Sequence, residues 1–138
     1  MQNETTKEKH EQLVIDCFVD KSQRDRLKQL TKTKKGRIKL RHYLAHSIKF
    51  NKRYILQIPK NMETPDDVFQ LLVKKGSPNN CCYLISENTN FDGKTIKLKD
   101  ALQDIIGSNI ATIISCVPGK LAYYEGEELN ERFILYKK

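Results

Sequence analysis

The sequence predicts a single domain of the α/β (or α+β) class, in which about three N-terminal helices precede a five-stranded mixed sheet with the element order β-α-β-α-β-β-β. Two observations predict this class. Apolar residues recur at helical spacing up to about residue 48, whereas after Asn51 short apolar runs alternate with helical periods and turn residues. The length of 138 residues is that of one domain, which can bury a core without disulfides.

The chain divides into a short lead-in and one domain. Residues 1–8 are polar, and we expect them to be disordered. Residues 9–138 form the domain, with a basic helical lobe at 9–50 and a sheet region at 53–138. No apolar run approaches the ~20 residues of a membrane helix, and the N-terminus lacks the apolar segment of a secretion signal. The four cysteines lack metal-type CxxC spacing. We therefore expect a cytoplasmic protein with reduced thiols, no membrane association and no cofactor.

Three helices are expected before residue 50. The first begins near Lys9, because the apolar residues that follow it share one helical face. The second follows Ser22, an N-cap type of residue, and ends in a basic turn with Gly36 as its C-cap. The third covers about 37–48. Their apolar positions are Leu13, Val14, Cys17 and Phe18, then Leu27 and Leu30, and then Ile38, Leu44, Ala45 and Ile48.

Five strands and two helices are expected after residue 50. Thr64 and Pro65 are typical of a helix start, as N-cap and first helical residue. A second, shorter helix ends at Gly107, and residues 88–93 form a loop. Because β-α-β connections are right-handed crossovers, the first three strands should be parallel and the last two should be antiparallel additions. The strands are predicted at residues 53–58, 81–86, 110–117, 120–125 and 132–136.

Positive charge is concentrated in the N-terminal third. Residues 21–53 contain thirteen Lys or Arg residues and one acid, Asp25, which is a balance of +12. Residues 61–138 contain nine bases and eleven acids, a balance of −2, within a total of +8. A concentrated positive field attracts polyanions over about 8–10 Å. The competing interpretation is a solvated lobe whose Lys content reflects an AT-rich coding bias.

The basic stretch predicts a nucleic-acid-binding surface. Lys and Arg on a shared face neutralise phosphates, and the interleaved Tyr43, Phe50 and Tyr54 could stack on unpaired bases. We therefore expect RNA or single-stranded DNA rather than a defined duplex site. A helix–turn–helix over residues 22–48, with Gly36 in its turn, is the alternative. The candidate contacts are Arg24, Lys28, Lys34, Lys35, Arg37, Lys39, Arg41, Tyr43, Lys49 and Arg53.

A second hypothesis is a small hydrolase or nuclease. In open parallel sheets, sites form beyond the carboxyl ends of strands, which would bring Glu87 and Asp92 near Cys116. A thiol nucleophile needs a base, for which His46 is the best candidate, and the two carboxylates could hold a divalent metal. The alternatives are structural roles: a core position for Cys116 and a turn or capping role for Asp92. No motif specifies a reaction, so we do not assign the protein as an enzyme.

His42 and His46 are spaced i, i+4 on the third predicted helix, which can place two imidazoles on one metal ion. The residues between them lack the Glu of an HExxH motif, and no third ligand is close in the sequence, so we assign no metal site. A third hypothesis is a protein–protein adaptor whose acidic segment 125–128 and basic lobe contact complementary partners. The same acids could instead pair with the basic lobe within the molecule.

Overall fold

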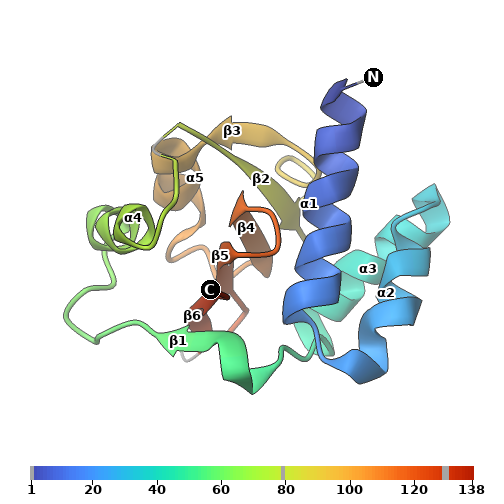
Figure 1. Cartoon of the computed structure of the whole chain (residues 1–138), viewed down its shortest axis with the longest axis horizontal. Helices are drawn as coiled ribbons and strands as arrows, with labels where there is room; N and C mark the ends of the chain where they lie inside the picture. Colours follow the sequence, from blue (N-terminus) through green and yellow to red (C-terminus); the bar gives the residue numbers. More distant parts are fainter. Residues whose placement is uncertain (1, 79, 129–130) are drawn as a thin grey trace.

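A six-stranded antiparallel sheet separates two layers of helices (Figure 1). The computed structural model describes residues 2–78, 80–128 and 131–138. The strand order is β1-β6-β5-β4-β2-β3. The strands are β1 (Ile55–Gln57), β2 (Cys81–Ser86), β3 (Thr95–Lys97), β4 (Thr112–Val117), β5 (Leu121–Glu125) and β6 (Arg132–Tyr136).

The helices divide between the two faces of this sheet. The helices are α1 (Gln2–Phe18), α2 (Arg24–Leu30), α3 (Lys34–His46), α4 (Pro65–Lys74) and α5 (Leu98–Ile105), with 3₁₀ turns at Lys21–Gln23 and Lys52–Tyr54. Helices α1, α2 and α3 cover one face, and α4 and α5 cover the other (Figure 1). Within the described ranges, no helix combines the length and apolarity needed to cross a membrane. The mixed class of the fold is as predicted.

The prediction of a mixed, five-stranded sheet is wrong, because all neighbouring strands are antiparallel and a sixth strand is present. The physical reason is β3, whose three residues lie in a segment that the sequence assigned to no strand. Strand β3 runs back along β2 and ends beside the first residue of β2. Helix α5 therefore begins at the end of the sheet where β2 begins, not where β2 ends. The chain then enters β4 antiparallel to β2, with Thr112 opposite Ser86.

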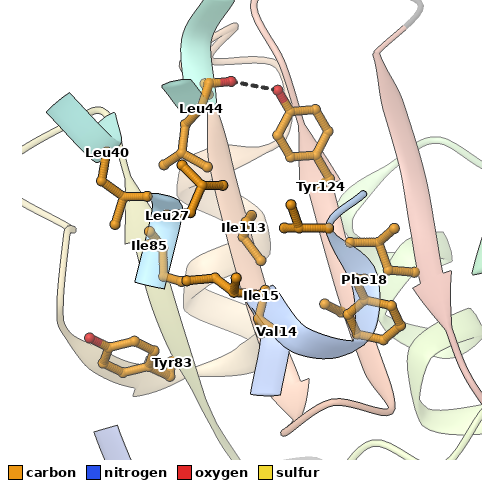
Figure 2. Packing of buried hydrophobic residues seen from close by; sticks show 14 of the residues in the cluster. Val14, Ile15, Phe18, Leu27, Leu40, Leu44, Tyr83, Ile85, Ile113 and Tyr124 are labelled. Atoms are coloured by element: carbon orange, nitrogen blue, oxygen red, sulfur yellow. Dashed lines mark hydrogen bonds between the residues drawn. The ribbon is translucent and has the colours of Figure 1, made fainter. Parts of the chain in front are cut away.

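Alternation along the strands builds two separate cores. Ile113 and Tyr124 belong to the core beneath α1, α2 and α3, while their neighbours Ile114 and Tyr123 belong to the core beneath α4 and α5. Figure 2 shows the first of these cores. It contains Val14, Ile15, Phe18, Leu27, Leu40, Leu44, Tyr83, Ile85, Ile113 and Tyr124. Because both faces are buried, the central strands are mostly apolar, and their polar residues are buried as well, namely Ser86, Thr112, Ser115 and Glu125.

The N-terminal helices differ from the prediction at three places. Helix α1 begins at Gln2, within the lead-in that we expected to be disordered, whose Met1 lies outside the described residues. Helix α3 begins at Lys34, because Thr33 acts as its N-cap and accepts a hydrogen bond from the Gly36 amide at 2.9 Å. Ile38, which we assigned to the core, is 59% exposed. Leu40 takes its place in the core, beside Leu44, which was predicted there and is buried.

Gly36 sits where α2 and α3 approach each other, rather than capping α2. A Cβ atom at Gly36 would lie 2.5 Å from the Leu30 carbonyl oxygen and 2.9 Å from the Leu30 Cα. Both neighbours are backbone atoms, so the contact cannot be relieved by rotating a side chain. The close approach of the two helices therefore requires glycine.

We predict that Gly36→Ala destabilises the protein by about 1–3 kcal/mol, because overpacking outweighs the gain in helix propensity. Urea unfolding followed by circular dichroism measures this change. Lys35→Ala is the matched control, since Lys35 is exposed on the same helical turn. Equal stability of Gly36→Ala and Lys35→Ala would contradict the close packing.

Candidate functional site

Helix α3 exposes one continuous face of basic and imidazole side chains. Lys35, Lys39, His42 and His46 follow one another at spacings of four, three and four residues, which places them on one side of a helix. All four are exposed. A hollow at the C-terminal end of this face is lined by Lys39, His42, Tyr43, His46 and Ser47. We call the four-residue set the α3 face.

The loop after α3 extends the positive charge. Lys49 and Arg53, both candidates from the sequence, are exposed there together with Lys52. Lys34 is exposed at the start of α3. Arg24 is half-buried, and its Nε donates a hydrogen bond to the Val19 carbonyl at 2.9 Å. Lys34 and the three loop cations therefore add exposed positive charge before and after the α3 face in the chain.

Three of the thirteen basic residues at 21–53 are neutralised by carboxylates within the molecule. Lys28 Nζ lies 2.8 Å from an Asp16 oxygen, and Arg37 and Arg41 are paired to Asp92. Among the described residues, the other ten form no ion pair. The candidate phosphate contacts thus separate into a paired group and an exposed group.

Arg37 is the centre of a buried ionic network that ties α3 to α1 and to the sheet. Its Nε and one terminal nitrogen donate to the two Asp92 oxygens, each at 2.9 Å, and its other terminal nitrogen donates to Glu11. The Tyr83 hydroxyl also donates to Glu11. Burial opposes the guanidinium charge, but the hydrogen bonds to Asp92 and the charge of Glu11 outweigh it and raise the pKa of Arg37. The Arg37 guanidinium is therefore bound by carboxylates of the protein itself.

Asp92 has a structural role in this arrangement. Besides Arg37, it accepts a hydrogen bond from the Ser86 amide at 2.9 Å, which fixes the loop between β2 and β3. Arg41 approaches it at 3.4 Å from the next turn of α3. The Asp92 side chain is only 6% exposed. Its carboxylate oxygens are thus occupied by protein donors.

The expected meeting of Glu87 and Cys116 does not occur. Strands β2 and β4 are antiparallel, so Glu87 after β2 and Cys116 near the end of β4 lie at opposite ends of the sheet. Cys116 is buried beneath α4 and α5, and burial raises the pKa of its thiol to about 12. A thiolate nucleophile at this position is therefore disfavoured, and His46 does not face it.

His46 and Glu87 lie at the same end of the sheet, together with Glu127. One ligand atom of each of these three side chains lies within 4.8 Å of the others, and His46 Nδ1 is 3.5 Å from a Glu127 oxygen. His42 stacks edge-to-face on His46 with 5.3 Å between the ring centroids. The acidic segment 125–128 thus makes one of the contacts to the basic lobe that the sequence suggested.

Tyr124 fixes the end of α3 against this edge of the sheet. Its hydroxyl donates a hydrogen bond of 2.7 Å to the Leu44 carbonyl, two residues before His46 (Figure 2). Burial raises the pKa of Tyr124, and the charges of Glu131, Glu127 and Glu87 raise it further. The phenol therefore stays protonated and keeps its donor role. This contact positions His46 beside the two glutamates.

The aromatic candidates are packed more than the sequence suggested. Phe50 contacts Tyr124 and Phe133 edge-to-face, at 4.8 and 5.8 Å between ring centroids. Tyr54 contacts Phe18, and Lys137 lies over its ring. Tyr43 packs partly against the core but also lines the hollow beside the α3 face. Phe50 lines a second hollow, together with Lys49 and Lys52.

Sequence reasoning missed Glu11 and singled out Glu127 only as part of an acidic segment. A signal for Glu11 existed, since it lies one turn before the apolar face formed by Val14 and Ile15. The partner of Glu127 could not be found without the topology, because His46 is far away in the chain. Comparison with protein-family models, curated proteins and solved structures found no match.

We predict that Arg37→Met lowers the free energy of unfolding by about 3–5 kcal/mol, because it leaves Glu11 and Asp92 buried without their counter-charge. Chemical denaturation measures the change. Arg41→Met is the control, since Arg41 contacts Asp92 at the longer distance, and we expect a loss of about 1 kcal/mol or less. Arg37→Lys should fall between the two, because it keeps the charge and loses the paired geometry. Similar losses in both Met variants would refute the central role of Arg37.

Thiol labelling should separate the four cysteines by burial. In the folded protein, iodoacetamide is expected to modify the exposed Cys81 rapidly and the half-buried Cys17 slowly. Cys82 and Cys116 should react only after unfolding, because both are buried and burial raises the pKa of each thiol. Peptide mass spectrometry assigns the sites. Rapid modification of Cys116 in the folded protein would contradict its burial and restore it as a candidate nucleophile.

Proposed function

We propose that the protein binds nucleic acid, RNA or single-stranded DNA, through the α3 face and the adjoining loop 49–53. The observation that carries this proposal is the alignment of Lys35 and Lys39 with His42 and His46 on one exposed side of α3. Lys34 and the loop cations adjoin that side. Cations that share a face can contact successive phosphates and release their counterions.

We leave the paired group of cations out of the proposed binding surface. Arg37 and Arg41 face Asp92, and Lys28 faces Asp16, so a phosphate would have to compete with a carboxylate already in place. The rest of the chain supplies no comparable surplus, since residues 61–138 carry nine bases against eleven acids. We therefore confine the proposed binding surface to the α3 face and the loop 49–53. Tyr43, beside the hollow, is the candidate for base stacking.

A second candidate function is the reading of duplex DNA, which the arrangement of α2 and α3 favours. The two helices pack together and are joined by residues 31–33 alone, as in a helix–turn–helix. In that motif, residues near the N-terminus of the second helix contact base edges. Lys34, Lys35 and the exposed Ile38 occupy this position in α3. This candidate uses the same helix but a different substrate, so one experiment tests both.

Fluorescence anisotropy with short single-stranded RNA, single-stranded DNA and duplex DNA, across a salt series, distinguishes the candidates. We expect steep salt dependence with a preference for one single-stranded class. Replacing Lys34, Lys35 and Lys39 together by Gln should weaken binding and reduce the magnitude of the salt slope by about 2, at about 0.7 for each lost phosphate contact to a single strand. A preference for the duplex would favour the second candidate.

A matched control removes the same charge elsewhere. Lys74, Lys97 and Lys120 are exposed on α4, on β3 and in the turn between β4 and β5. Their triple Gln variant has the same net charge as the α3 variant but keeps the α3 face. Equal weakening of nucleic-acid binding in both variants would mean that net charge, and not the α3 face, determines the affinity. Absence of binding at low salt would refute the proposal and direct attention to a protein partner.

A further inference from the structure

Three side chains with metal-binding atoms converge where β2, β5 and α3 end. They are His46, the last residue of α3, Glu87, the first residue after β2, and Glu127, two residues after β5. One ligand atom of each lies within 4.8 Å of the other two, and His46 Nδ1 lies 3.5 Å from the Glu127 carboxylate. All three are at least partly accessible from outside the protein. The cluster therefore combines proximity with access for an ion.

The topology makes this convergence a fixed feature of the fold. Strands β2 and β5 flank β4, and each is antiparallel to it, so the two strands run in the same direction and end at the same edge. The Glu87 amide donates a 2.9 Å hydrogen bond to the Ala111 carbonyl, which continues the ladder beyond β2. Tyr124 holds the end of α3 over this edge through the Leu44 carbonyl (Figure 2). The Glu87 backbone and the end of α3 are thus each held by a hydrogen bond of their own.

The charges of the cluster favour a cation. Two carboxylates within a few ångströms repel each other, and a protonated His46 would compensate for only one of them. The ligand atoms of a tetrahedral zinc ion, at 2.0–2.2 Å from the metal, are ~3.4 Å apart. The 3.5 Å between His46 Nδ1 and Glu127 already fits that spacing. Small side-chain rotations of Glu87 and Glu127 would bring the third ligand atom into place.

We propose that His46, Glu87 and Glu127 bind one divalent transition-metal ion of the zinc type. The imidazole selects against Mg²⁺ and Ca²⁺, which prefer oxygen ligands, and the mixed nitrogen and oxygen set suits Zn²⁺. Three protein ligands leave at least one coordination position for water or for an oxygen of a bound molecule. The site would lie at the C-terminal end of the α3 face. It does not depend on the proposed nucleic-acid binding.

Isothermal titration calorimetry with Zn²⁺ tests the site in the untagged full chain. The measurement uses a Cys81→Ser background, because the exposed Cys81 thiol would otherwise compete for zinc. We expect one ion to bind per chain. His46→Ala, Glu87→Gln and Glu127→Gln should each weaken the affinity at least tenfold. In NMR spectra, the imidazole signals of His46 should shift on addition of Zn²⁺.

Matched variants separate this site from the alternatives. Glu128→Gln removes an exposed carboxylate next to Glu127 and should bind zinc like the parent protein. Circular dichroism of every variant distinguishes a lost ligand from a lost fold. Absence of stoichiometric zinc binding by the parent protein would overturn the proposal. Equal losses in His42→Ala and His46→Ala, with unchanged binding in both Glu→Gln variants, would also overturn it by assigning the ion to the helical His pair.

Discussion

The bidentate pairing of Arg37 with Asp92 determines how the N-terminal helices sit on the sheet. This contact, together with the bond from Arg37 to Glu11, joins α3, α1 and the loop after β2 at one buried point. Because an α-helix is rigid, fixing Arg37 and the core residues Leu40 and Leu44 on the inside also fixes what faces outward. The residues that then face outward are those of the α3 face. The orientation of every exposed cation on α3 therefore depends on the contacts that Arg37, Leu40 and Leu44 make on the inner side of the helix.

The same interaction divides a charge cluster that looks uniform in the sequence. Counting basic residues at 21–53 measures a net charge, but it does not show which of them have carboxylate partners. Glu11 and Asp92 lie outside that stretch, on either side of it in the chain, and both come to Arg37 only after folding. A buried ion pair of this kind specifies geometry more than it adds stability, because desolvation offsets much of the Coulomb energy. The attraction of this stretch for polyanions then comes from its exposed cations.

Local patterns predicted most of the elements and few of their relations. Thr64 and Pro65 marked the start of α4 correctly, and the apolar run at β4 indicated a strand covered on both faces. The strand direction was missed because β3 is three residues long and has no periodicity to detect. Ile38 was misplaced for a related reason. Its spacing fits an apolar stripe, but the close contact at Gly36 and the Arg37 network rotate α3 so that Leu40 faces the core.

Strand direction also decides which chemistry the sheet edge can assemble. In a parallel sheet, the ends of β2 and β4 would meet, and a thiol and a carboxylate would share one site. In the antiparallel sheet, the neighbours of β4 on both sides end together, so Glu87 meets Glu127 instead of Cys116. The thiol is then left in the core, where burial keeps it protonated. The insertion of one short strand, β3, thus brings two carboxylates together in place of the expected thiol and carboxylate. The imidazole of His46 completes that site because Tyr124 binds the last turn of α3.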